Sequence, residues 1–331
     1  MTVDTGANEP SGSIRRSPRE PCDNRAVLRE SVAKAGDGIR PVSYGERKLA
    51  DAHPDLAGGA RETYLATLRR LEADGYDFDA QVDLLLERLG RIIDLRSHER
   101  VLVVGCGPRP QLLRVLLRRG FEALGIEPVR AFAQSARDFL DEDRVIEAPA
   151  ESLDLPDGSQ DIVLCLSVLE HVESPSKSLD ECFRVLSPGG LLMVTTTNRH
   201  GLSPTGQNGE YNVRFFNWLP RTLQESFVFK HLHFDPDLAN WSLRPAVHWF
   251  TYSDLCRLGR EARFCQFYSI VDMLRPDDSV VRRNLLRRLV LRRMQLSPWL
   301  RAIVLTLTQR GGTIVMLKRP EQDRERALET T

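Results

Sequence analysis

The sequence lacks an excess of charge of either sign and lacks long hydrophobic runs. Lysine plus arginine number 46 and aspartate plus glutamate number 46, so the formal net charge is zero. Without a basic excess the chain has no general field for phosphate backbones, which disfavours generic nucleic-acid binding. No stretch approaches the ~20 apolar residues that cross a bilayer. These absences argue against a general nucleic-acid-binding protein and an integral membrane protein.

Cysteine is also scarce, and no two cysteines have the spacing of a metal-binding pair. The six cysteines contain no C-x-x-C pair, and most lie in apolar runs, where a reduced thiol packs as a small hydrophobe. This disfavours a disulfide framework and a zinc knuckle. The first 21 residues are polar and have no apolar region of the secretory-signal type. We therefore expect a cytoplasmic protein.

At 331 residues the chain should hold one decorated domain or two. Residues 1–42 mix glycine, serine, proline and charge without a period, which predicts a disordered arm, and we expect the same of the tail 321–331. Residues 43–98 carry two amphipathic helical patterns, which predict a helical extension. The apolar positions of the two patterns are Tyr64, Leu65, Leu68 and Leu71, and Val82, Leu85, Leu86, Leu89 and Ile92.

Residues 99–200 alternate short apolar strands with helical stretches, and residues 251–320 add a helix and two strands. This pattern predicts an α/β fold: a doubly wound, Rossmann-like sheet of about seven strands with helices on both faces, whose alternating strands run in parallel. The expected strands are 101–106, 123–127, 145–148, 161–166, 191–197, 264–273 and 313–318, and the expected helices are 111–119, 129–139, 176–185 and 251–263. The last of these helices is expected to begin with Thr251 or Ser253 as its cap.

Two stretches interrupt the alternation. Residues 201–250 hold about half of the aromatic residues, which predicts an insertion over an acceptor pocket, a satellite core of rings, or both. Residues 276–310 form a basic helical insertion. Within it, Asn284–Arg292 is amphipathic, and 282–293 is a candidate contact for a membrane surface or anionic lipid; the other interpretation is a solvated, partly packed helix. A second apolar stripe, from Trp299 to Leu307, is expected to pack on the domain.

The first strand of the core runs into Gly105-Cys106-Gly107-Pro108 and then a helix. Glycines at this place let a ligand approach the backbone at a helix N-terminus. Pro110 stands where a dinucleotide-binding loop has its third glycine, which disfavours NAD. Glu127 ends the second strand at the distance from Gly105 at which an acid accepts from ribose hydroxyls. The pattern favours an adenosine-containing ligand over a plain tight turn followed by a solvated acid.

Three later stretches, in register, resemble a known family. Residues 148–163 (APAESLDLPDGSQDIV) are similar to the acidic "A-E-x-L-P…G-S-F-D-x-V" run of class I S-adenosylmethionine-dependent methyltransferases, whose fourth-strand motif resembles Leu166–Val172 (LSVLEHV). Arg184–Gly190 (RVLSPGG) resembles the turn that leads into their fifth strand. Within this family the chain resembles ubiquinone-pathway O-methyltransferases and methyltransferase type 11 or 12 domains.

The resemblance implies a binding site for S-adenosyl-L-methionine. By this resemblance Gly105, Cys106 and Gly107 face the methionine part and Glu127 holds the ribose. It likewise implies the remaining contacts, with the adenine bordered by Ala150 and Glu151 and the sulfonium by Leu166 and Ser167. Two positions depart from the family, since Val103 and Pro149 stand where many members have acids. These departures favour the alternative of a non-catalytic cofactor-binding protein.

On the acceptor side, His171 follows the fourth strand and is the candidate base for an oxygen acceptor; its alternative role is to bond the backbone or shape the pocket. The candidate acceptor-binding residues are Tyr211, Asn212, Arg214 and His248. Some relatives bind a divalent metal through E-x-x-E-H. Ser167 replaces the first acid here, so we expect no metal; a metal would need a third ligand from His200, His231, His233 or His248.

We therefore expect a methyltransferase that modifies an oxygen of a small molecule, such as a sugar, a lipid-linked glycan or a secondary metabolite, with no nucleic-acid partner. The aromatic insertion suits a compact ligand better than a protein surface. The alternatives are a small-molecule N-methyltransferase, an RNA methyltransferase and a non-catalytic cofactor-binding protein.

Overall fold

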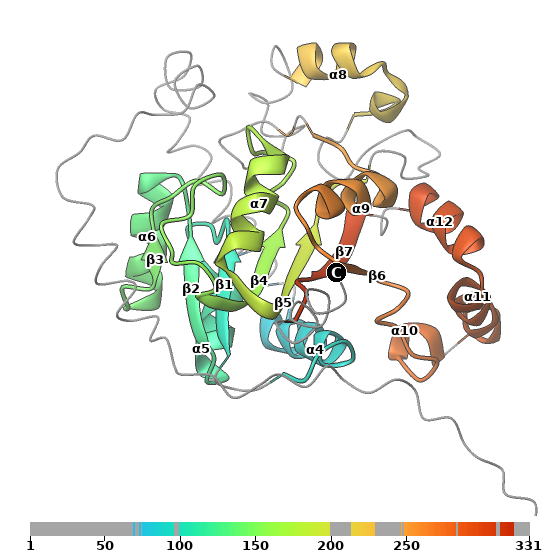
Figure 1. The fold of residues 1–331 in the computed structure, drawn as a ribbon, viewed down its shortest axis with the longest axis horizontal. Coiled ribbons are helices and arrows are strands. Elements are labelled where there is room, and N and C mark those ends of the chain that lie inside the picture. Colours follow the sequence, from blue (N-terminus) through green and yellow to red (C-terminus); the bar gives the residue numbers. More distant parts are fainter. Residues whose placement is uncertain are drawn as a thin grey trace, which may run out of the picture.

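The computed structural model describes residues 75–95, 99–198, 213–228, 248–282, 284–308 and 312–320, with the single residues Arg69, Ala73 and Ala246 (Figure 1). The predicted disordered arm and tail, the first helical pattern at 64–71, and most of the aromatic insertion lie outside the described residues. The domain boundaries stay predictions.

Seven strands form one sheet in the order β3-β2-β1-β4-β5-β7-β6, which confirms the predicted α/β fold. Strands β1 to β5 pair in parallel, whereas β7 is antiparallel to both β5 and β6. The strands of the alternating segment are parallel, as predicted, whereas the antiparallel direction of β7 was not predicted, because apolar composition reports burial and not strand direction. The strands are β1 (Arg100–Val104), β2 (Glu122–Ile126), β3 (Val145–Ile146), β4 (Gln160–Leu166), β5 (Leu186–Thr195), β6 (Gln266–Ser269) and β7 (Thr313–Leu317).

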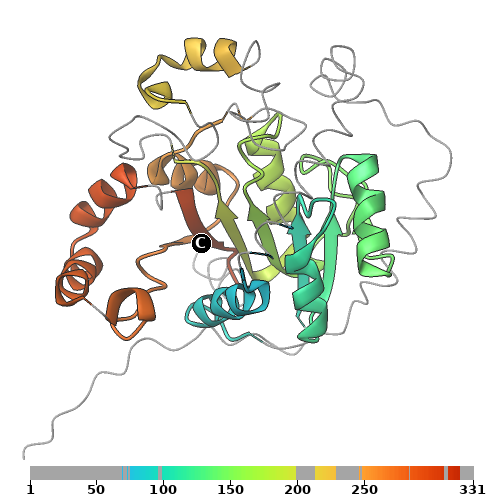
Figure 2. The same cartoon turned by 180° about the vertical axis from the view of Figure 1, so that it is seen from behind.

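Helices cover both faces of the sheet, and three more helices lie beyond its β6 edge (Figures 1 and 2). The helices of the core are α4 (Phe78–Gly90), α5 (Gln111–Arg118), α6 (Arg130–Leu140), α7 (Pro175–Val185) and α9 (Tyr252–Glu261). Those beyond the edge are α10 (Ser279–Arg282), α11 (Leu285–Leu296) and α12 (Pro298–Leu307). Helix α8 (Arg221–Phe227) stands apart from the sheet, on the side of the carboxyl ends of the parallel strands.

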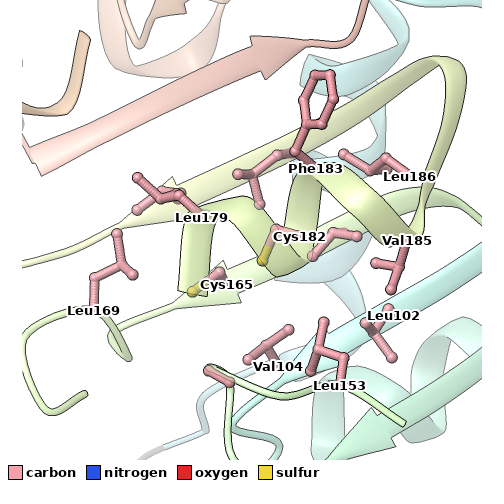
Figure 3. Packing of buried hydrophobic residues seen from close by; sticks show 14 of the residues in the cluster. Leu102, Val104, Leu153, Cys165, Leu169, Leu179, Cys182, Phe183, Val185 and Leu186 are labelled. Carbon is pink, nitrogen blue, oxygen red and sulfur yellow. The ribbon is translucent and has the colours of Figure 1, made fainter. Parts of the chain in front are cut away.

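Alternation along β1 divides the core into two layers. Leu102 and Val104 face the cluster that contains α7 and α9, whereas Val101 and Val103 face the cluster that contains α4 and α5. Figure 3 shows the first cluster, where Cys182 and Leu179 of α7 lie over the sheet. Successive side chains of each central strand are buried on opposite faces, and this explains why its sequence is apolar throughout.

Local sequence signals set where the helices begin. Thr251 caps α9 with a reciprocal capping box, in which its hydroxyl accepts from the amide of Asp254 and the Asp254 carboxylate accepts from the amide of Thr251. Ser174 caps α7, and Pro175 follows at the first helical position, where no amide is needed. Of the two expected caps, Thr251 and Ser253, the structure uses Thr251.

Strand β6 is shorter than the predicted 264–273. The carboxylate of Asp272 accepts from the amide and the hydroxyl of Ser269, at 2.7 and 2.8 Å, and this bonding turns the chain after Ser269. The apolar residues that follow, Val271 and Leu274, pack against α10–α12 instead of extending the sheet.

Helices α11 and α12 make up most of the basic insertion. In α11 the buried side chains are Leu291 and Met294, whereas the predicted apolar arc is exposed. The predicted stripe on α12 packs only in part: Leu300 and Val304 lie against the cluster that contains the buried Leu305, whereas Trp299 is 71% exposed. Among the described residues, no helix is long and apolar enough to cross a membrane.

A buried ion pair ties together the amino ends of β1 and β4. The guanidinium of Arg100 donates to the carboxylate of Asp161, with Nε to Oδ2 and Nη2 to Oδ1 distances of 3.0 Å each, and the Ser187 hydroxyl donates to the same carboxylate. Burial opposes ionisation of Asp161, but the bonds from Arg100 outweigh it, so the pKa of Asp161 lies below its ordinary value. This pair is structural, because it lies at the opposite end of the strands from the glycine loop.

Candidate functional site

The candidate site lies at the carboxyl ends of the neighbouring strands β1 and β4. At this point of the sheet the connections to the next strands run toward opposite edges. From β1 the chain runs through α5 to β2 on one side, and from β4 through α7 to β5 on the other. In open α/β sheets, ligands bind at this reversal, in the crevice outside the carboxyl ends of the strands. The glycine loop after β1, Glu127 after β2 and the turn 167–174 after β4 all follow those ends.

The backbone of the glycine loop requires glycine at two positions. Gly105 has φ +68° and Gly107 has φ +70°, in the left-handed region that other residues avoid. A Cβ on Gly105 would lie 2.5 Å from Cγ2 of Val168 in the turn after β4. The loop and this turn are therefore in close contact, which only the absence of a side chain permits.

Glu127 is buried against the glycine loop. Its Oε2 accepts from the amide of Gly107 at 3.0 Å, and its Oε1 accepts from the amide of Val129 at 3.1 Å. The carboxylate is thus held between the loop after β1 and the N-terminus of α6. The structure thus brings Glu127 and the loop together, and the contact of Glu127 with a ribose stays a prediction.

Cys106 contributes its backbone to the loop and its side chain to the core. The Cys106 amide donates to the carbonyl of Ile126, and a Cβ on Gly125 would meet the Cys106 sulfur at 2.8 Å. Burial, with the nearby Glu127 charge second, raises the pKa of the thiol well above its usual range. The side chain is therefore a neutral packing group, and any ligand contact by Cys106 would be through its main chain.

The adenine-side candidates are arranged differently from one another. Ala150 is buried. Glu151 reaches across to the turn after β4, where its Oε1 accepts from the amides of Glu173 and Ser174, at 2.6 and 3.3 Å. These bonds join the loop after β3 to the start of α7. The structure thus shows Glu151 as a residue that positions the loop, a role that the resemblance did not imply.

The turn after β4 holds the candidates nearest the predicted sulfonium position. Leu166 is half-buried, and Ser167 is exposed with φ +55°, a conformation that non-glycine residues rarely adopt. The Ser167 amide donates to the carbonyl of Thr195 at the end of β5. This bond continues the β4–β5 ladder and leaves the Ser167 side chain at the surface.

Glu170, His171 and His248 come together beside this turn. His171 is half-buried in the turn between β4 and α7 and does not begin a helix. His248, from the end of the aromatic insertion, donates its amide to the carbonyl of Glu170 at 3.3 Å. The Nε2 of His248 lies 3.0 Å from the carbonyl oxygen of Val172. The structure therefore places His248 against the turn that carries His171.

Two polar residues of this region had no signal in the sequence. Thr196, after β5, donates its hydroxyl to the buried carboxylate of Glu170 at 2.7 Å. The side-chain amide of Asn198 donates to the carbonyls of Leu305 and Thr306 at 3.3 and 3.1 Å, and also to that of Thr308. Both bonds join segments far apart in the sequence, so neither is visible as a motif.

The remaining acceptor-side candidates are not brought together with this turn by any described contact. Arg214 is exposed, and Tyr211 and Asn212 lie outside the described residues. Phe216, Val228 and Ala246 form a small buried cluster with Trp249, as the satellite-core interpretation expected. Within the part of the chain that the structure describes, no three histidine, cysteine or acidic side chains are grouped as metal ligands.

Part of the family resemblance reflects architecture. Arg184, from the RVLSPGG stretch, donates to the carbonyls of Leu153 and Leu155 at 2.8 and 2.7 Å. Glu181 accepts from the amide of Leu153 at 2.8 Å and also pairs with Arg184. These bonds fasten the AESLDLP stretch to α7, which explains why the two motifs occur together.

A family model described as "Methyltransferase domain" (Methyltransf_11) matches residues 102–194. That range contains the glycine loop, Glu127 and the turn after β4. Residues 102–194 form a class I methyltransferase domain. The predicted resemblance is confirmed, and the cofactor of this domain is S-adenosyl-L-methionine.

Curated relatives of the methyltransferase domain include enzymes named ubiquinone biosynthesis O-methyltransferase. The one from Psychrobacter arcticus is 36% identical over 111 residues, covering 31% of this chain and 43% of the relative. The one from Bradyrhizobium sp. is 32% identical over 146 residues, covering 42% and 55%. The chain thus spans about half the length of these curated relatives. A solved S-adenosylmethionine-dependent methyltransferase from Mesorhizobium loti is 15% identical, covers 73% of this chain and 99% of its own, and has a TM-score of 0.42.

The residues of the methyltransferase domain fit this cofactor. The left-handed glycines keep side chains away from the loop that would contact its methionine part, and a buried carboxylate suited to hydroxyl groups lies beside them. Val103, which replaces an acid common in the family, points into the core and is 5% exposed. Its side chain is therefore a packing group and not a missing ligand contact.

Proposed function

We propose that this chain transfers a methyl group from S-adenosylmethionine to an oxygen atom of a small-molecule acceptor. The observation that carries the proposal is the contact of His248 with the turn that holds Glu170 and His171. This contact joins the aromatic insertion to the edge of the sheet that carries the cofactor site. The names of the O-methyltransferase relatives support oxygen as the methylated atom.

The cofactor supplies an activated methyl group when bound, and the protein supplies alignment and proton transfer. In our proposal the glycine loop and Glu127 bind the cofactor, and His171 accepts the proton of the acceptor hydroxyl. His248 and Thr196 hold the turn that carries His171, through their bonds to Glu170 and Val172. The aromatic insertion would cover the acceptor and exclude water.

The test uses methyl-labelled S-adenosylmethionine with panels of sugars, lipid-linked glycans and aromatic secondary metabolites. The expected product carries an O-methyl ether carbon, assigned by nuclear magnetic resonance. An N-methyl product would show instead that the protein is a small-molecule N-methyltransferase. Label transferred only to RNA would overturn the small-molecule acceptor, and tight cofactor binding without turnover on any panel would favour a non-catalytic protein.

The role of His171 has its own variant. His171→Gln should lower kcat by about 10²–10⁴-fold with little change in cofactor affinity, and should remove the lower-pH limb of the kcat profile. Lys177→Gln, an exposed change on the neighbouring α7, is the matched control. A His171→Gln enzyme that loses cofactor affinity but keeps its pH profile would show that His171 only shapes the pocket.

A further inference from the structure

Helices α11 and α12 expose a large apolar surface that the methyltransferase fold does not require. Leu285, Leu286 and Leu289 are 70%, 67% and 54% exposed, and on the next helix Trp299 is 71% exposed. Monomeric soluble proteins rarely expose so many large apolar side chains together. The other exposed apolar residues of this α11–α12 surface are Val290, Leu296, Ile303 and Leu307.

The α11–α12 surface is also strongly basic. Arg287, Arg288, Arg292 and Arg293 are exposed on α11, and residues 285–307 contain no aspartate or glutamate. At 100° per residue the exposed leucines share one arc of α11, with Arg288 and Arg292 along its border and Arg293 within it. The buried residues of α11, Leu291 and Met294, lie on the opposite side.

Two acids near these helices, Asp278 and Asp272, pair with arginines outside α11. Asp278, just before α10, accepts from Arg91 of the α4 end at 2.7 and 2.8 Å. Asp272, after β6, pairs with Arg301 of α12 at 2.5 Å. These two pairs fasten the helical unit to the core. Because α11 and α12 carry arginines and no acid of their own, these helices are positively charged.

We propose that the α11–α12 surface docks on an anionic lipid membrane. A helix with a leucine-rich arc bordered by arginines lies in the plane of a membrane, with its apolar side chains among the lipids and its cations at the anionic head groups. Trp299 suits the same boundary, because its ring is apolar and its N–H is polar. A second copy of the chain is a poorer occupant, since a two-fold contact through this surface would bring its arginines together.

Docking there would hold the methyltransferase domain next to the membrane in a fixed orientation. The end of α12 is hydrogen-bonded to Asn198, which follows β5 and pairs with Phe250. Asn198 belongs to the edge of the sheet that carries the candidate site. The surface and that edge are therefore directly linked, and this inference holds whichever acceptor is methylated.

The test is flotation of the full chain with vesicles of equal parts phosphatidylglycerol and phosphatidylcholine, compared with phosphatidylcholine alone. We expect binding to the anionic vesicles only, and weaker binding as salt is raised. Arg288→Gln with Arg292→Gln should lower partition roughly 25-fold, about five-fold for each lost charge. The matched control, Arg130→Gln with Arg257→Gln, removes two exposed arginines elsewhere and should leave partition unchanged.

The apolar contribution is tested separately. Leu286→Gln with Leu289→Gln should weaken partition by at least roughly ten-fold, whereas Leu223→Gln on α8, 55% exposed, should not. Trp299→Phe should remove most of the fluorescence quenching caused by brominated lipids. Thermal unfolding and cofactor titration of every variant confirm that the fold is retained. Equal binding to neutral vesicles, arginine variants that bind normally, or a dimer that the leucine variants disperse would each overturn the proposal.

Discussion

The amide of Gly107 donates a hydrogen bond to the carboxylate of Glu127 at 3.0 Å, across 20 residues of sequence. The bond joins the loop after β1 to the end of β2. The Glu127 side chain therefore both holds the glycine loop in its conformation and places a negative charge beside it. Changes at either residue should therefore affect cofactor binding more than they affect the fold.

Glu127→Ala should weaken S-adenosylmethionine binding by at least about 1.5–3 kcal/mol, because it removes an ionised acceptor and releases the Gly107 amide. Calorimetric titration measures the change, with S-adenosylhomocysteine as a second ligand and NAD as the negative control. Glu122→Ala, at the start of the same strand, is the matched variant. Unchanged affinity in a folded Glu127→Ala protein would contradict the placement of the ribose.

Gly105→Ala should lower the free energy of unfolding by more than the roughly 1–2 kcal/mol that a left-handed alanine costs, because the new Cβ also meets Val168. Val168→Ala in the same chain should recover the steric part and leave the backbone part. Urea unfolding of the two single variants and the double variant forms a double-mutant cycle. Additive effects would show that the loop and the turn after β4 are not in contact.

Asp161→Ala should lower the free energy of unfolding by about 3–5 kcal/mol near neutral pH, because it leaves the Arg100 charge buried and uncompensated. Asp180→Ala, an exposed change on α7, should cost little. The pKa of Asp161 is lowered by folding, so the stability from the pair is complete above about pH 4–5 and is lost as pH falls through the lowered pKa. The difference in unfolding free energy between wild type and Asp161→Ala should therefore become smaller in acid. A difference that stays constant with pH would contradict the lowered pKa of Asp161.

Excess chelator should leave methyl transfer unchanged. Ser167 occupies the position of the first acid in the metal-binding pattern, and its side chain is at the surface. The Glu170 carboxylate, the next acid of that pattern, instead accepts from the Thr196 hydroxyl. Activity that chelator abolishes, and that added Mg²⁺ or Zn²⁺ restores, would show that a metal joins the site.

The fold class and the cofactor class were predictable because they depend on local and repeating signals. Apolar runs separated by helical patterns predict layers of helices on a sheet. The motifs between Gly105 and Gly190 each follow or precede one predicted strand, and their order along the chain resembles that of the family. The cap at Thr251 needs only neighbouring residues, so it was predicted as well.

The direction of β7, the early end of β6 and the burial within α11 were not predictable in this way. Apolar composition shows that a segment is buried but not which way it runs. On α11 the leucines formed the clearest apolar arc, yet Leu291 and Met294 pack inward, against Val271, Leu274 and Leu305 from other segments. The periodicity of one helix does not show which of its faces meets the rest of the chain.

What the sequence determined by itself is the α/β domain and its glycine loop, since each follows from residues close together in the chain, and the cofactor followed from the resemblance of three motifs to a known family. Only the tertiary structure showed which side chains have contacts that the sequence did not predict. The Cys106 side chain packs in the core, Glu151 accepts from an amide just before α7, and His248 contacts the turn that contains His171. These contacts join segments far apart in sequence, and only the packing of strands and helices brings them within hydrogen-bonding distance.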